Sequence, residues 1–241
     1  MDSQRFVRIT HRILEEELQR EGIGTLGEKP LHRIVKWYLE PDNSRHEQPV
    51  GPFVGDILRE DGLWEIQTGG FFPLRKKLQL ILPQMPVTLV IPLAAEKWLR
   101  WVDPSTGEVT PRRRSPRKGS PLDLGYQLLH IQPYLTHPHL HWHLLWLEEE
   151  EYRMRDGWGN DGKRGSHRLV RVPVGLLQEE HFNSLQDLLP LLLPQTECTV
   201  AQLAREGGVS PLCAQRLLAA LYRCGLVQRR KEGRSYQYWI K

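Results

Sequence analysis

The sequence predicts an α/β protein with a mixed sheet, followed by a small C-terminal module of helices and a hairpin. Two observations predict the sheet. Asp61-Gly62 lies between two runs of alternating apolar residues, as in a β-hairpin, and an amphipathic helix pattern separates this hairpin from the apolar run 87–91. The module is predicted by two short helical patterns within 199–224, followed by two strand-like runs.

Composition excludes several classes of protein. With 39% apolar residues, 26% charged residues and 8 Trp, the 241-residue chain is not a disordered polypeptide. No apolar run reaches the roughly 18–20 residues of a membrane helix, and the first twenty residues carry Arg5, Arg8 and Arg12 rather than an apolar signal region. The three cysteines lack CxxC spacing. We therefore expect a cytoplasmic protein with no membrane partner.

The first element of the sheet region is a helix. Apolar residues recur with helical spacing over 31–38, and Pro41 ends the pattern. Glu28 lies three residues before Leu31 and seven before Val35. We therefore expect Glu28 on the core-facing side of this helix.

The hairpin that follows carries acidic residues on one face. If Asp61 and Gly62 form the turn, Asp56 lies opposite Gln67. One face of the hairpin is then apolar, and the other carries Asp56, Glu65 and Gln67 among apolar neighbours. Because mid-strand carboxylates between apolar side chains are costly unless they are paired or bind metal, we expect this cluster to be functional.

A helix and a buried strand complete the sheet region. Pro73 suits the first turn of a helix that ends near Leu82, and the run 87–91 reads as a fully buried strand. A strand, a helix and a strand within about 30 residues indicate a parallel crossover connection. The sheet is therefore expected to be mixed.

The middle of the chain predicts two more strands and a basic segment. The runs 97–102 and 108–112 read as strands joined by a turn at 103–107. The basic residues that follow include Arg112, Arg113 and Arg114. This segment can follow a phosphate backbone or form an exposed loop, and the sequence favours neither.

Histidine alternation marks a later strand, at His137, His139, His141 and His143. This spacing could supply metal ligands, but no cysteine or acid completes a zinc motif, so a polar strand face is the favoured interpretation. The run 148–151 is four glutamates, which are either solvated or cover a basic surface within the chain.

The C-terminal module resembles a winged helix-turn-helix. Thr199 can cap a first helix, Ser210 followed by proline can open a second, and Gly225 can end it. Two strand-like runs over 226–230 and 235–240 complete the order of elements.

Positive charge is concentrated in this module. Residues 194–241 carry eight basic and three acidic residues, whereas the whole chain carries 33 and 29. The charge favours DNA as the partner, and docking to another protein is the alternative. The expected nucleic-acid contacts are Ser210, Gln215, Arg216, Arg229, Arg230, Lys231 and Arg234.

The order helix, hairpin, helix and strand, with acids at the helix start and on both hairpin strands, resembles the PD-(D/E)xK nuclease superfamily over about residues 28–93. This superfamily includes restriction endonucleases and Holliday-junction resolvases. The resemblance implies a restriction-endonuclease-like core in which Asp56 and Glu65 bind Mg²⁺ or Mn²⁺, with the Ile66 carbonyl as a third ligand. It also implies that Glu28 orients a metal-bound water.

One position departs from the family pattern. The last motif residue is usually lysine, whereas this chain has Gln67, and glutamine cannot act as an acid or base. Lys77 in the following helix is the candidate replacement. Alternatively, Gln67 marks an inactive core, or Glu65 forms an ordinary salt bridge with Arg75 or Lys77.

The leading hypothesis is a metal-dependent DNA endonuclease with a variant ExQ motif. It places a nuclease-like domain at 1–183 and a winged helix-turn-helix domain at 184–241. The alternative is a non-catalytic winged-helix transcriptional regulator or protein-interaction module on a degenerate nuclease core. A symmetric homodimer is compatible with both hypotheses.

Overall fold

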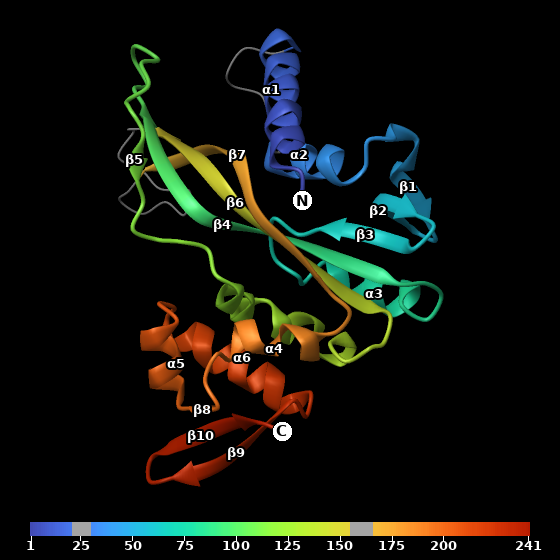
Figure 1. Ribbon diagram of the computed structural model, residues 1–241, viewed down its shortest axis with the longest axis vertical. Helices are drawn as coiled ribbons and strands as arrows, with labels where there is room; N and C mark the ends of the chain where they lie inside the picture. Colours follow the sequence, from blue (N-terminus) through green and yellow to red (C-terminus); the bar gives the residue numbers. More distant parts are fainter. Residues whose placement is uncertain (21–29, 155–165) are drawn as a thin grey trace. The chain divides into compact units, whose positions relative to one another are not determined.

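The computed structural model describes residues 1–20, 30–154 and 166–241 (Figure 1). Contacts divide the chain into two compact units. Unit 1 comprises Met1–His46, Pro92–Gly119 and Leu145–Glu179. Unit 2 comprises Glu47–Ile91, Ser120–Leu144 and Glu180–Lys241. Strands β4 (Val87–Val102), β6 (Leu140–Met154) and β7 (His167–Phe182) contribute residues to both units.

The protein is α/β with a mixed sheet, as the sequence predicts. The main sheet has the order β1-β2-β3-β4-β6-β7, where β1 is His46–Val50, β2 is Phe53–Arg59 and β3 is Gly62–Ile66. Strands β2 and β3 are antiparallel, whereas β3 and β4 are parallel from Leu63↔Val87 to Ile66↔Val90. Helix α3 (Leu74–Ile81) provides the expected crossover between β3 and β4.

The hairpin register differs by two residues from the sequence prediction. Arg59 pairs with Gly62, so the turn residues are Glu60 and Asp61 rather than Asp61 and Gly62. The reason lies at Gly62, which has φ +126° and whose added Cβ would lie 2.3 Å from the Pro86 carbonyl oxygen. This close approach requires glycine at the start of β3. A shift of two residues keeps every side chain on its predicted face.

Helix α3 packs against the rest of unit 2 through one apolar face. Pro73 is its N-cap residue, and Leu74, Leu78 and Ile81 are buried. Lys77 lies between Leu74 and Leu78 on the edge of the buried face and is half-buried. The helix therefore carries a lysine beside the sheet.

Two packed helices begin unit 1. Helix α1 is Ser3–Arg20 and α2 is Pro30–Leu39, and Arg33 of α2 pairs with Glu16 and Glu17 of α1. Helix α1 is also held to β7, because the Thr10 hydroxyl donates to the Pro173 carbonyl oxygen at 3.1 Å. A short 3-10 helix, η1 (Asn43–Arg45), follows α2.

The prediction of two strands at 97–102 and 108–112 is only partly correct. Residues 97–102 continue β4, and the turn at 103–107 is present with Gly107 at φ +72°. Residues 108–112 form only an isolated bridge between Val102 and Val109, and β5 is Arg113–Arg114. The second strand is therefore shorter and later than the sequence suggests.

Three of the four glutamates of the run 148–151 in β6 are covered rather than solvated. Glu149, Glu150 and Glu151 are all buried. Their basic partners within unit 1 are Lys97 on Glu151, Arg100 on Glu150, Arg153 on Glu151 and Arg171 on Glu149. Of the two interpretations of this run, the intramolecular pairing with basic residues is correct.

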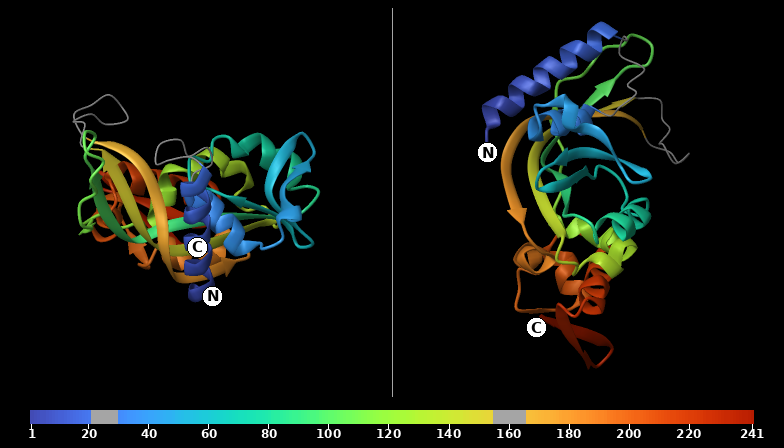
Figure 2. Two further views of the ribbon diagram at one scale, coloured as in Figure 1. Left: turned by 90° about the horizontal axis from the view of Figure 1, so that it is seen from above. Right: turned by 90° about the vertical axis from the view of Figure 1, so that its right-hand side faces the viewer.

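Short helices and a second sheet form the rest of unit 2. The elements are η2 (Pro121–Tyr126), η3 (Leu128–Tyr134), α4 (Leu185–Leu192), β8 (Glu197–Cys198), α5 (Val200–Glu206), α6 (Pro211–Arg223), β9 (Val227–Glu232) and β10 (Ser235–Ile240). The second sheet has the order β8-β10-β9. Thr199 and Ser210 are N-caps as expected, and Gly225 follows α6 at φ +71°. Figure 2 shows the hairpin β9–β10 extending beyond α5 and α6.

Helix α6 packs closely on η2. A Cβ at Gly125 would lie 2.4 Å from the Cys213 carbonyl oxygen, and the Cys213 thiol donates to the Leu122 carbonyl oxygen at 3.2 Å. Residues 184–241 thus belong to the same compact unit as β2, β3 and α3, and the domain boundary at 183 stays a prediction. Within the described ranges, no helix is long and apolar enough to cross a membrane.

Candidate active site

Asp56 and Glu65 lie side by side on β2 and β3. The corrected register brings Asp56 next to Glu65 rather than opposite Gln67. The Ile66 N–H donates to Asp56 Oδ2 at 2.7 Å, and the Asp56 N–H donates to Glu65 Oε1 at 3.3 Å. Each carboxylate is therefore oriented by the backbone of the other strand.

Lys77 completes the cluster from α3. Its Nζ lies 2.7 Å from Glu65 Oε1 and donates to the Val54 carbonyl oxygen, also at 2.7 Å. Side-chain exposure is only 14% for Lys77 and 4% for Glu65, so the pair is largely removed from water. The structure thus joins three of the predicted site residues: Asp56, Glu65 and Lys77.

Burial and charge perturb Glu65. The pKa of Glu65 is raised to about 7, because removal from water and the negative charge of Asp56 raise it more than the Lys77 ammonium lowers it. The raised pKa means that ionised Glu65 is less stable in the folded protein than in water. Extra positive charge at this place would lower that cost.

The donor atoms here suit a hard divalent cation. The N–H and C=O of one strand residue face the same neighbouring strand. Because the Ile66 N–H bonds to Asp56 and the Gln67 N–H bonds to Val90 of β4 at 2.8 Å, the Ile66 carbonyl faces β2. Two carboxylates and this carbonyl are oxygen ligands of the kind that Mg²⁺ and Mn²⁺ prefer. The residues present therefore fit the expected metal.

The other two predicted catalytic residues are Gln67 and Glu28. Gln67 follows β3 and is half-buried, and its side chain lies on the Glu65 face because the two residues are two apart on an extended chain. Glu28 lies outside the described residues. The cluster joined by contacts in the described ranges is thus two carboxylates and one lysine.

The basic segment at 112–114 belongs to unit 1, whereas the acid pair belongs to unit 2. Arg112 contacts Glu148 at 3.2 Å and lies 4.4 Å from the Trp98 ring centroid. Arg114 contacts Glu96 at 3.1 Å. Because these two arginines already pair with carboxylates, they contribute less net positive charge than the sequence suggests.

A concave surface lies in the C-terminal part of unit 2. This groove has a volume of about 670 Å³ and lies between α5, the start of α6 and the hairpin. Its polar lining includes Arg205, Gln215, Arg229, Arg234 and Tyr236. Three of these residues, Gln215, Arg229 and Arg234, are among the predicted nucleic-acid contacts.

Arg229 is held between aromatic rings, a feature that sequence reasoning missed. Its guanidinium carbon lies 4.3 Å from the ring centroids of Tyr222 and Tyr236. Tyr238 is its cross-strand partner and a hydrogen-bond partner. The alternation of Tyr236 and Tyr238 opposite a basic strand was the signal in the sequence. Such stacking fixes the guanidinium and leaves the N–H groups that do not bond to Tyr238 for an anion.

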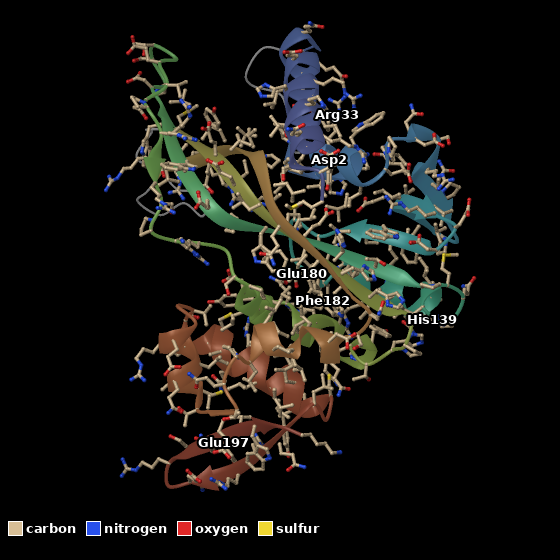
Figure 3. All side chains as sticks on the ribbon, viewed as in Figure 1. Asp2, Arg33, His139, Glu180, Phe182 and Glu197 are labelled. Carbon is tan, nitrogen blue, oxygen red and sulfur yellow. The ribbon has the colours of Figure 1, made fainter. Side chains whose placement is uncertain are left out.

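Two of the remaining predicted contacts, Ser210 and Arg230, have partners of their own. Ser210 caps α6, and its hydroxyl lies 2.6 Å from the Tyr126 hydroxyl. Arg230 pairs with Glu232 at 2.6 Å and lies 3.8 Å from Glu197, which Figure 3 labels. Lys231 is exposed on β9 and Arg216 is half-buried on α6.

Two of these histidines place a ring nitrogen within hydrogen-bond distance of a backbone carbonyl oxygen. His139 Nδ1 lies 2.9 Å from the Leu82 carbonyl oxygen, and His141 Nδ1 lies 2.9 Å from the Asn183 carbonyl oxygen. In the part of the chain that the structure describes, no three or more His, Cys, Asp or Glu side chains form a group that could hold a metal ion. Only His141 and His143 lie on β6, whereas His137 and His139 precede it, and His143 is buried, so the predicted polar strand face is wrong for most of these residues.

Comparison with known proteins relates most of the chain to one family. Residues 29–200 match the family described as "Domain of unknown function (DUF8091)". A protein of Treponema pallidum (strain Nichols) described as "Uncharacterized protein" is 30% identical over 180 residues, which cover 73% of this chain and 71% of that protein. No solved structure matches the chain. The family match includes Asp56, Glu65 and Lys77.

Proposed function

This chain belongs to the DUF8091 family, and we propose that it is a metal-dependent DNA endonuclease of the PD-(D/E)xK type with a winged helix-turn-helix DNA-binding module. The observation that carries the proposal is the contact of Lys77 with Glu65 beside Asp56. This contact supplies a lysine at the acid pair, although the motif itself ends in Gln67.

The order of elements supports the nuclease-like core. Helix α2, the hairpin β2–β3, helix α3 and strand β4 follow one another as in the superfamily, and the acids lie on the two hairpin strands. The chemistry that Mg²⁺ or Mn²⁺ supplies when bound is polarisation of the phosphodiester and activation of a water. Asp56, Glu65 and the Ile66 carbonyl would hold the ion.

The neighbouring residues have roles in the same proposal. Lys77 binds a non-bridging phosphate oxygen and orients the substrate, since its ammonium is fixed by Glu65 and Val54. Gln67 positions a water by hydrogen bonding, because an amide can donate and accept but cannot exchange a proton. Glu65 and Lys77 balance each other's charge while the site is empty of substrate.

The C-terminal groove supports DNA as the partner. The order α4, β8, α5, α6, β9 and β10, with β10 between β8 and β9, agrees with a winged helix-turn-helix. Arg229 and Arg234 line the groove beside Gln215 at the start of α6. Cations would contact phosphates, and Gln215 would face base edges.

A cleavage assay tests the proposal. Supercoiled, linear and branched DNA are incubated with the purified full chain in Mg²⁺, Mn²⁺ or chelator. Asp56→Asn and Glu65→Gln should abolish metal-dependent cleavage. The matched control is Glu60→Gln, an exposed acid in the turn of the same hairpin, which should cleave as the wild type does. Cleavage that survives both site substitutions excludes this site.

The same assay distinguishes the nuclease from the alternative functions, a regulator or a protein-docking module. A chain that binds DNA but cleaves none of these substrates in either metal is a winged-helix regulator on a degenerate core. If the protein neither binds nor cleaves DNA, the result favours protein docking as the role of the C-terminal module. Circular dichroism of each variant distinguishes loss of the site from loss of the fold.

A further inference from the structure

Unit 1 carries a second basic surface, where α1 packs beside α2. A groove of about 240 Å³ is lined by Arg5, Arg8, Ile9 and Arg12 of α1, with Trp37 of α2 and Pro41 after it. The three arginines are spaced i, i+3 and i+7, so they lie on one helix face at intervals of about 4.5 and 6 Å along the axis. Figure 3 labels Asp2 just before α1 and Arg33 on α2.

These arginines are poorly neutralised, unlike Arg33. Arg33 contacts both Glu16 and Glu17, the second at 3.1 Å. Within the described ranges, Arg12 has one exposed contact with Glu16 at 3.7 Å, and neither Arg5 nor Arg8 forms a salt bridge. The groove therefore keeps most of its positive charge.

A buried guanidinium nitrogen adds a second, independent sign of a ligand. Nη2 of Arg5 is buried and has no hydrogen-bond partner among the described residues, while its guanidinium carbon lies 5.5 Å from the Tyr38 ring centroid. A buried donor without a partner is unfavourable, so movement of the Arg5 side chain to an anion in the groove would be favoured.

The groove also offers a stacking surface. The Arg12 guanidinium carbon lies 4.8 Å from the Trp37 ring centroid, and the edge of His46 meets Trp37 at 5.0 Å between centroids. Nucleobases stack on tryptophan rings and on guanidinium planes. The Arg12–Trp37 pair can therefore receive a base beside the cations that receive its phosphates.

We propose that this groove binds a segment of single-stranded DNA. Arg5, Arg8 and Arg12 contact successive phosphates, and one base packs on the Arg12–Trp37 pair. A paired base inside a duplex has no free face for this stacking, so the groove selects unpaired strands. The inference rests on the proposed function only in taking DNA as the partner, and it does not require cleavage.

Binding of the full-length protein in chelator tests this inference. A fluorescently labelled short oligothymidylate and a hairpin duplex of similar length serve as probes, and anisotropy is followed across salt concentrations. Arg8→Gln should reduce the slope of log affinity against log salt by about 0.7 for the single strand. Trp37→Leu should weaken single-strand binding about tenfold and leave the slope unchanged.

Matched controls and the duplex probe make the result decisive. Arg8→Lys keeps the charge and should bind as the wild type does, as should Arg168→Gln, an exposed arginine elsewhere in unit 1. Duplex affinity should be unchanged in all variants. The inference is overturned if the wild type does not bind the oligothymidylate, if Arg8→Gln binds it normally, or if both probes lose affinity equally. Because no metal is present, failure of cleavage leaves these outcomes unaffected.

Discussion

Replacing Lys77 with methionine should destabilise the protein in a pH-dependent way. Lys77 Nζ lies 2.7 Å from Glu65 Oε1, and the ion pair is largely buried. The folded pKa of Glu65 is about 7, above its ordinary value of 4.5. Without the ammonium, this pKa rises further because burial and Asp56 then act unopposed.

The sign and size of the effect follow from proton linkage. Between its ordinary pKa and about pH 7, Glu65 takes up a proton on folding in both proteins, so both lose stability equally as pH rises. Above pH 7 the wild-type carboxyl has ionised, whereas the Lys77→Met variant still takes up a proton. The variant therefore loses a further amount of about 1.4 kcal/mol per pH unit until its own pKa is reached.

Urea denaturation in chelator at several pH values between about 5 and 9 measures this difference. The free energy of unfolding of Lys77→Met, relative to the wild type, should be independent of pH below about 7 and fall above it. Lys76→Met, one residue away and exposed, is the matched control and should track the wild type. A difference between Lys77→Met and wild type that is the same at every pH would refute the coupling of Lys77 to Glu65.

Three further substitutions test other parts of the fold. Gly62→Ala should cost more than about 1 kcal/mol in urea denaturation, because its Cβ would collide with the Pro86 carbonyl, whereas Gly69→Ala, with nothing within 4 Å, should not. Thr199→Ala should cost about 1 kcal/mol, since it removes the cap hydrogen bond from the Gln202 N–H; unchanged stability would refute the cap. Burial raises the pKa of Glu149, so this residue adds to the fall of wild-type stability as pH rises, and Glu149→Gln should make that fall less steep in thermal melts; parallel pH profiles would contradict it.

The faces of the hairpin could be predicted from the sequence, but its register could not. Alternation alone places Asp56, Glu65 and Gln67 on one face. The register depends on the approach of Gly62 to Pro86, which is a contact between residues distant along the chain. That contact moves Asp56 beside Glu65 and so tightens the candidate site.

Charged strands were the main obstacle to predicting the fold. Strand β4 continues to Val102 because its basic residues pair with the glutamates of β6, such as Arg100 with Glu150 at 2.7 Å. Local patterns allow the glutamate run 148–151 to be solvated, because Glu150 and its partner Arg100 are 50 residues apart in the sequence. The tyrosines around Arg229 were missed for the same reason, because their role depends on the pairing of β9 with β10.

Titration with Mn²⁺ by isothermal calorimetry tests the central claim most directly. The wild-type chain should bind one Mn²⁺ ion at Asp56 and Glu65, Asp56→Asn should lose that binding, and Glu60→Gln should retain it. Equal Mn²⁺ affinity of Asp56→Asn and the wild type would contradict the proposed metal site.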